Sequence, residues 1–166
     1  MKKRTFFTLF SLTLFALACG QHPLGLFGQI NSAPSFGVLL SSGNTITSPY
    51  SSSVPYLTFN ASSGSILVPE DGFITAFGND GTYAYVDIYH NARFSSRIGI
   101  QLNSYFQSFT QQVGQSLTKG QSLKDGYLGG LIRFQIQDNG RIVCPIAYFS
   151  ENARTQIASY SSNPCQ

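Results

Sequence analysis

Charged residues are scarce in this sequence. Lys, Arg, Asp and Glu make up 10% of its 166 residues, with 10 basic and 7 acidic side chains. Three of the basic residues, Lys2, Lys3 and Arg4, stand at the start of the chain, so the remainder has no net charge. Such a body lacks the basic patch that nucleic-acid binding needs. We therefore expect no nucleic-acid partner. Such a surface suits neutral partners, namely a glycan, a protein surface or another copy of the chain; the alternative is a surface that is rich in Ser and Asn without any binding role.

Residues suited to catalysis or metal binding are also few. The only histidines are His22 and His90, and no Cys-x-x-Cys pair occurs, which argues against a metal site. Neither a Gly-x-Ser-x-Gly turn nor a phosphate-binding loop is present, and most acidic residues stand in turns. Asp80 and Asp87 could at most join backbone carbonyls around calcium. We predict no catalytic residue, no cofactor and no enzyme; an envelope glycan-acting hydrolase or a carbohydrate-binding module is the alternative.

The N-terminus has the pattern of an export signal. A basic head precedes an apolar stretch from Phe6 to Leu17, and the small residue Ala18 follows. This order is typical of a secretory signal peptide. The apolar stretch is shorter than the roughly 20 residues that a membrane-spanning helix needs.

The end of this segment, Ala16-Leu17-Ala18-Cys19, resembles the lipobox of bacterial lipoproteins. The resemblance implies cleavage before Cys19 and acylation of its thiol, palmitate included, which tethers the protein to a membrane. Gly20 follows the cysteine where an aspartate would favour the inner membrane, so the resemblance implies a lipid anchor in the outer membrane, with exposure at the cell surface as one outcome. The alternative is an ordinary signal peptide that happens to end beside a cysteine.

Three cysteines are an odd number for an exported protein. If Cys19 is acylated, Cys144 and Cys165 remain as a pair. Because the export route is oxidising, we predict a disulfide between them; two free thiols are the alternative.

We expect three parts: a signal peptide at 1–18, a lipid-anchored tether at 19–34 and one β-sandwich domain at 35–166. Helix formers are scarce in the body, while β-branched and aromatic residues recur in short runs separated by Gly, Asn, Asp and Pro. Asn139-Gly140 predicts a type I′ hairpin turn, and residues 41–55 predict a long loop. The sequence thus favours an all-β antiparallel sandwich of about eight to ten strands. The expected strands are 36–40, 56–60, 65–68, 72–78, 82–90, 96–102, 105–113, 121–123, 128–137 and 141–149; residues 105–113 fit a helical period equally well.

The clearest strand runs from Thr82 to His90. Side chains alternate along a strand, so Ala84, Val86 and Ile88 should face the core. Tyr83, Tyr85 and Tyr89 should then lie together outside, as a face for a second copy or a glycan. Plain β propensity is the alternative. His90 ends this strand, and we expect it at the surface or capping the strand end.

The segment Ser65-Ile-Leu-Val-Pro-Glu-Asp-Gly-Phe-Ile-Thr-Ala resembles the strand–turn–strand of jelly-roll domains, with its turn at Val68–Gly72. Such domains occur in phage fibre heads and in trimers like tumour necrosis factor and complement. Ser116–Leu123 resembles the turn before a late strand of that family, with Gln121 where the family has aspartate. The resemblance implies a homotrimer with a binding role. We therefore expect a membrane-anchored surface or envelope lipoprotein whose sandwich binds or assembles.

Overall fold

The computed structural model describes residues 32–127, 129–157 and 164–165. The expected signal peptide, Cys19 and the tether up to residue 31 lie outside the described residues. In the described part of the chain, no helix has both the length and the apolar character needed to cross a membrane.

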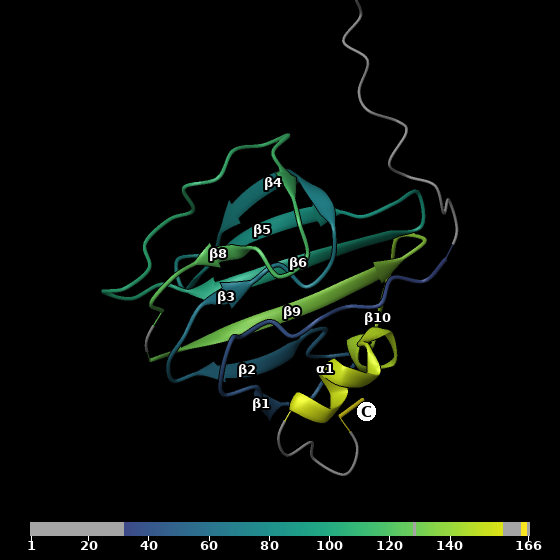
Figure 1. Cartoon of the computed structure of the whole chain (residues 1–166), viewed down its shortest axis with the longest axis horizontal. Helices are drawn as coiled ribbons and strands as arrows, with labels where there is room; N and C mark the ends of the chain where they lie inside the picture. The colour runs from purple at the N-terminus through teal and green to yellow at the C-terminus, as the bar shows by residue number, and fades with distance from the viewer. Residues whose placement is uncertain (1–31, 128, 158–163, 166) are drawn as a thin grey trace, which may run out of the picture.

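One large antiparallel sheet forms the body of the molecule (Figure 1). Its eight strands follow the spatial order β1-β2-β9-β6-β5-β4-β7, and β10 pairs with the end of β9 beyond β2. A second sheet pairs β3 with β8 and lies in front of β6 and β9 in Figure 1. The strands are β1 (Thr45–Ser48), β2 (Leu57–Ala61), β3 (Ile66–Leu67), β4 (Gly72–Asn79), β5 (Tyr83–Tyr89), β6 (Phe94–Gln101), β7 (Ser116–Leu117), β8 (Ser122–Lys124), β9 (Gly130–Asp138) and β10 (Arg141–Val143).

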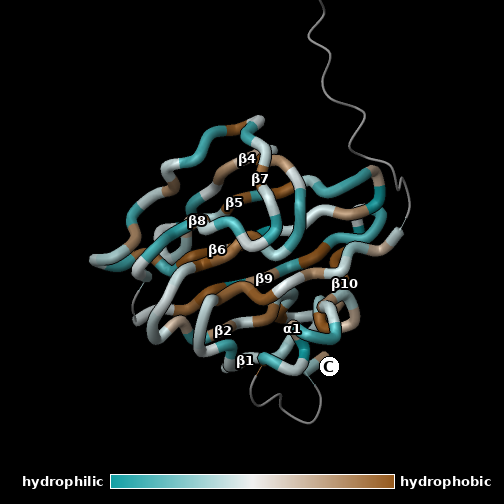
Figure 2. The backbone as a smooth tube through the Cα atoms, in the orientation of Figure 1, coloured by the Kyte–Doolittle hydropathy of each residue, from teal (hydrophilic) through white to brown (hydrophobic). Residues whose placement is uncertain are grey.

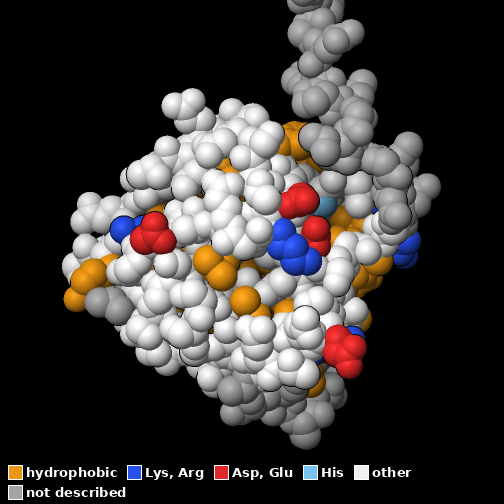
Figure 3. All heavy atoms as spheres, viewed as in Figure 1, with side chains coloured by type: hydrophobic (Ala, Val, Ile, Leu, Met, Phe, Trp, Pro, Cys, Tyr) orange, Lys and Arg blue, Asp and Glu red, His pale blue; other side chains and the backbone are white. Residues whose placement is uncertain are grey.

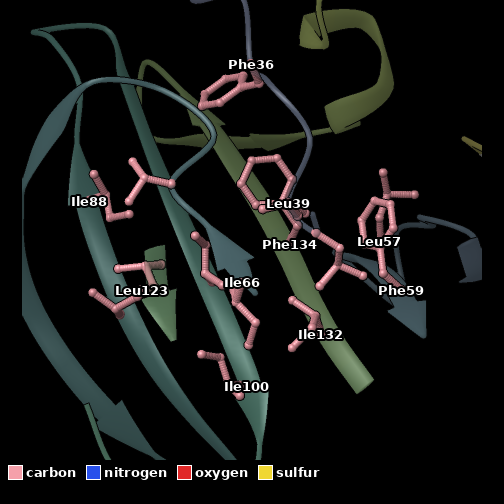
Figure 4. Close-up of a cluster of buried hydrophobic side chains, with 14 of the residues drawn as sticks. Phe36, Leu39, Leu57, Phe59, Ile66, Ile88, Ile100, Leu123, Ile132 and Phe134 are labelled. Atoms are coloured by element: carbon pink, nitrogen blue, oxygen red, sulfur yellow. The ribbon is translucent and has the colours of Figure 1, made fainter. Parts of the chain in front are cut away.

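The core lies between the two sheets. Ile132, Phe134 and Ile136 alternate along β9 and are fully buried. From the other layer, Ile66 and Leu123 pack into the same cluster (Figure 4). Figure 2 shows the hydrophobic residues gathered along the central strands and the hydrophilic ones in the outer loops. The prediction of an all-β antiparallel sandwich is confirmed.

The Asn139-Gly140 turn forms as the sequence predicts. Asn139 has φ 50° and Gly140 has φ 74°, the two positive angles of a type I′ turn. The turn sets Arg141 opposite Asp138 and so fixes the register of β10 on β9.

Several expected elements differ from the structure. Residues 36–40 make only isolated bridges, and 105–113 form a loop that ends before β7. The expected loop 41–55 contains β1, whose Thr45 and Ile46 pair with β2. The last expected strand stops at Val143, because Pro145 has no N–H to donate to a ladder. A 3₁₀ helix, η2 (Pro145–Tyr148), and a short helix, α1 (Glu151–Gln156), follow it.

Cys144 and Cys165 form a disulfide, in agreement with the cysteine count. The bond fastens the C-terminal tail beside Tyr50, whose N–H donates to the Pro164 carbonyl at 2.9 Å. The tail therefore lies against the segment that follows β1.

The surface carries little charge, as the composition predicts. On the face seen in Figure 3, red and blue side chains lie next to each other in small groups among uncharged atoms. Among the ion pairs of the described chain is Lys119–Glu70, with Nζ and Oε2 3.1 Å apart. Charges of opposite sign thus neutralise one another locally and leave no broad charged patch in this view.

Candidate functional site

The side of the main sheet turned away from β3 and β8 carries a group of aromatic and basic side chains. We call this group the arginine–tyrosine face; it comprises Tyr56, Tyr83, Tyr85, Arg97 and Arg133. Strand pairing places Arg133 of β9 opposite Gly99 of β6, and Gly99 opposite Tyr85 of β5. These three residues form one row across three neighbouring strands.

Gly99 lets the two side chains of this row meet. A Cβ at Gly99 would lie 2.6 Å from Cε1 of Tyr85 and 3.3 Å from Cβ of Arg133. The tyrosine ring therefore occupies the space that a side chain on β6 would fill. Its hydroxyl reaches Arg133 and accepts a hydrogen bond from Nη1 at 3.1 Å. A glycine in a strand often marks such a close approach.

The guanidinium of Arg133 lies between two tyrosine rings. Its Cζ is 3.7 Å from the ring centroid of Tyr83 and 4.3 Å from that of Tyr56, within the range of cation–π attraction. Tyr56 comes from the segment before β2, where Gln135 donates from Nε2 to the Pro55 carbonyl at 2.8 Å. Arg133 Nε is buried and has no hydrogen-bond partner in the structure.

Asp80, in the β4–β5 turn, lies at the edge of the arginine–tyrosine face and binds Tyr85. Its Oδ1 accepts from the N–H groups of Thr82 and Tyr83, and its Oδ2 accepts from the Tyr85 hydroxyl at 2.6 Å. The Tyr85 hydroxyl, followed by these two N–H groups, lowers the pKa of Asp80 to about 2. Burial, followed by the hydrogen bond to Asp80, raises the pKa of Tyr85. At neutral pH Asp80 is therefore a carboxylate and Tyr85 a neutral phenol.

Arg133 differs from Arg93 and Arg97 in its contact with a carboxylate. Arg93 binds both carboxylate oxygens of Asp138, at 2.6 and 2.7 Å. Arg97 binds both oxygens of Asp87, at 2.6 and 2.8 Å. For Arg133 the carboxylate contact is Asp80 Oδ2, 3.9 Å from Nη1, too far for a hydrogen bond. Arg133 therefore has donor capacity that the fold itself does not use.

The three tyrosines predicted to share one exposed face differ in burial and in the residues that they contact. Ala84, Val86 and Ile88 face the core as alternation predicts. Tyr85 is half-buried on the arginine–tyrosine face, but Tyr83 is only 4% exposed, because Arg133 covers it. Tyr89 packs on Phe73 with ring centroids 5.0 Å apart, at the opposite end of β5. The expected continuous row of exposed tyrosines is thus absent from the folded chain.

His90 is buried rather than at the surface. Its Nδ1 lies 2.6 Å from the Asp71 carbonyl oxygen and its Nε2 lies 2.8 Å from Ser96 Oγ. Since a carbonyl only accepts, Nδ1 carries the proton and Nε2 accepts from the serine. Burial lowers the pKa of His90, so the ring is neutral at pH 7. Both nitrogens are therefore engaged: His90, which follows β5, is linked to Asp71 just before β4 and to Ser96 of β6.

Neither a calcium site nor another metal site forms in the described part of the chain. Asp80 and Asp87, the calcium candidates, are bound to their own turn and to Arg97. Within residues 32–127, 129–157 and 164–165, no three His, Cys, Asp or Glu side chains gather to hold a metal ion.

No protein-family model and no curated protein sequence matches the chain. Solved structures do resemble it. Csd3 from Helicobacter pylori gives a TM-score of 0.58 at 19% identity, over 70% of this chain and 33% of Csd3. A putative M23 peptidase from Pseudomonas aeruginosa gives 0.52 at 18% identity, over 72% of this chain and 55% of the peptidase. A chain of the SpoIIQ–SpoIIIAH pore-forming complex gives 0.50 at 10% identity, over 78% of this chain and 100% of that one.

These likenesses define the class of fold. The chain has the all-β fold of M23 peptidase-like domains, and it spans about a third of the length of Csd3. The prediction that the protein is not an enzyme is overturned, because a putative peptidase has this fold. That prediction depended on the absence of familiar catalytic motifs, and two chains can share a fold without sharing such motifs.

Sequence reasoning missed Arg97, Arg133 and Tyr56. A signal for Arg133 was present, because Leu131, Arg133 and Gln135 alternate with buried residues along the expected strand 128–137. Alternation assigns Arg133 to a face, but the identity of its cross-strand neighbours depends on pairing between distant segments. Tyr56 stood at the start of an expected strand, and nothing local placed its ring over the sheet.

Proposed function

We propose that this protein is an exported envelope protein whose M23 peptidase-like domain binds a peptide on the arginine–tyrosine face. The carboxylate of the peptide is the group that Arg133 binds. The observation that carries the proposal is Arg133, held between two rings and without a carboxylate at hydrogen-bond distance. A guanidinium binds a carboxylate through two parallel N–H···O bonds. The side chain of Arg133 is 25% exposed, so a ligand can reach it.

The choice of peptide is supported by the fold, since the Pseudomonas aeruginosa structure is described as a putative peptidase. The Tyr56 ring stacks on the guanidinium and the Tyr85 hydroxyl accepts a hydrogen bond from it. Both rings are half-buried and offer apolar surface beside Arg133. A carboxylate on Arg133 would therefore be placed next to aromatic rings that can contact the rest of a peptide. Because that structure is described as a putative peptidase, cleavage of the bound peptide is the reaction to test for.

A charge-matched binding experiment tests this proposal. Tetra-alanine with a free C-terminal carboxylate should bind the purified protein, and the C-terminal amide should bind at least about tenfold more weakly. Arg133→Gln should weaken binding of the free acid roughly 10- to 100-fold, which is the loss of affinity expected when a hydrogen bond between charged groups is removed. Titration calorimetry measures the affinity of each protein for each peptide. Mass spectrometry of the peptide after incubation shows whether it is also cleaved.

Arg93→Gln is the matched control. It makes the same chemical change at an arginine already bound to Asp138, away from the site, so affinity should stay within about twofold. Equal binding of acid and amide, or equal binding by the Arg133→Gln variant, would contradict the assignment.

The proposed envelope location is supported by the sequence of the N-terminal segment, a basic head followed by an apolar stretch. We propose that Cys19 is acylated and holds the domain on the outer membrane. Mass spectrometry of the protein from its own cells should find an N-terminal peptide that begins at Cys19 and carries diacylglycerol. An unmodified N-terminus at another residue would rule this anchor out.

A further inference from the structure

Strand β4 has an open edge. One side of β4 pairs with β5, and on the other side β7 pairs only with Gly72 and Phe73. Ile74 is also covered, because its N–H donates to the Gln115 carbonyl and its carbonyl accepts from the Gly114 N–H. Beyond the bulge that follows Ile74, no strand of the described chain pairs with the outer edge of β4.

The backbone groups that point out of this edge can be assigned. The Asp80 N–H donates to the Tyr83 carbonyl at 3.1 Å, and hydrogen-bonded positions alternate along an antiparallel pair. Gly78 therefore bonds toward β5, while the N–H and C=O of Phe77 and Asn79 point outward. For these outward groups the described chain supplies no backbone partner. Natural edge strands are commonly protected by charge or proline, and β4 contains neither.

Gly78 lies between these two residues. Nothing within the monomer requires a glycine at this position. Its φ is not positive, and a Cβ built on it would come no closer than 3.9 Å to another atom, the Cβ of Tyr85. Glycine inside a strand often marks the close approach of another backbone. At Gly78 that backbone would have to come from outside the described chain.

A hollow adjoins the same edge on the side that faces the second layer. It has a volume of about 420 Å³ and is lined in part by Phe77, Asn79, Ala84, Gln107 and Phe109. Phe77 is 36% exposed and packs on Phe109 with ring centroids 5.3 Å apart. The hollow therefore offers an aromatic wall directly beside the open edge.

We propose that β4 pairs antiparallel with β4 of a second copy, joining the two main sheets across a two-fold axis at Gly78. Phe77 of each copy then exchanges hydrogen bonds with Asn79 of the other, and the two glycines face each other. Side chains on one face of a pair are neighbours, so each Phe77 ring enters the hollow beside Asn79 of the other copy. The arginine–tyrosine face stays free for its ligand.

A second copy fits this edge better than a charged partner. The stretch Gly72–Asn79 carries no charge, and the chain without its basic head is neutral, so two copies do not repel each other. The same residues supply donors and acceptors in equal number, which is what a two-fold contact requires. This assembly is a dimer, whereas the jelly-roll resemblance implies a trimer.

A cysteine cross-link tests the pairing in the full chain. Residues facing each other at a non-hydrogen-bonded position lie about 4.5 Å apart between Cα atoms, within the range that a disulfide spans. Gly78→Cys in cells that export the protein should therefore give a covalent dimer on a non-reducing gel, lost on reduction. Thr47→Cys, exposed on β1 at the opposite edge of the sheet, is the matched control and should stay monomeric.

A second measurement separates pairing from random oxidation. Adding Phe77→Ser to Gly78→Cys should abolish the cross-link while circular dichroism stays unchanged, since Phe77 is at the surface. Light scattering of the protein without added cysteines should give twice the monomer mass, and Phe77→Ser should give the monomer mass. A folded Gly78→Cys variant that keeps a free thiol, equal cross-linking at Thr47→Cys, or a trimer mass would overturn the proposal.

Discussion

Replacing Gly130 with alanine should destabilise the fold by about 3 kcal/mol, the upper end of what overpacking a core typically costs. A Cβ at Gly130 would lie 2.0 Å from the Tyr127 hydroxyl oxygen and 2.9 Å from Asn103 Nδ2. Tyr127 is fully buried and its hydroxyl donates to the Gln101 carbonyl at 2.9 Å. Burial raises the pKa of Tyr127 to about 12, so this donor is retained at neutral pH. The added methyl group would overlap the hydroxyl that makes this hydrogen bond. Urea unfolding followed by circular dichroism measures the loss of stability.

Two further variants separate the clash from other causes. A Cβ on Gly129 would meet no atom within 4 Å, but the residue has φ +66°. Gly129→Ala should therefore destabilise the fold only through the strain of this left-handed conformation, by about 1 kcal/mol. Tyr127→Phe removes the clashing oxygen, and in that background Gly130→Ala should cost clearly less than in the native chain. A cost for Gly129→Ala equal to that of Gly130→Ala would show that steric overlap is not the reason.

Removing the Cys144–Cys165 disulfide should lower the free energy of unfolding by about 3 kcal/mol. The bond closes a loop between positions 21 residues apart, and the chain-entropy model assigns this amount to a loop of that size. The Cys144→Ser/Cys165→Ser variant should keep the circular dichroism of the sheet, because β2, β9, β6 and β5 pair without the tail. Chemical unfolding measures the stability, and hydrogen exchange at Tyr50, whose N–H donates to Pro164, should rise.

Reduction of the native protein supplies the control for this variant. Protein treated with a reductant should unfold at the same denaturant concentration as the double variant, and the double variant should not respond to the reductant. If the native and doubly substituted proteins are equally stable, the bond contributes nothing and the tail is held by its other contacts.

The arginine–tyrosine face and the β4 edge are separable by mutation. Arg133 and Gly78 lie in one row across the sheet, but Gly99 and Tyr85 stand between them. Arg133→Gln should therefore reduce peptide affinity and leave the molar mass unchanged, while Phe77→Ser should do the reverse. Failure of the peptide proposal would leave the pairing proposal intact, and the converse also holds.

Local chemistry in the sequence determined the class of fold and several of its parts. Alternation along Thr82–His90 assigned Ala84, Val86 and Ile88 to the core, because a strand turns successive side chains to opposite faces. The Asn139-Gly140 pair fixed a hairpin, since few other residues adopt positive φ at both positions. The odd cysteine count indicated the Cys144–Cys165 disulfide. Each of these features depends on residues near one another in the chain or on simple counting.

Only the tertiary structure decided the composition of the candidate site. Arg133 lies beside Tyr85 because β9 pairs with β6 and β6 with β5 in one register, with Gly99 leaving room between them. The same pairing covers Tyr83, which alternation alone assigned to an exposed face. It leaves the outer edge of β4 open at Gly78. Alternation determines the face on which a side chain lies, whereas its neighbours on that face are set by pairing between strands distant in sequence, which no local pattern records.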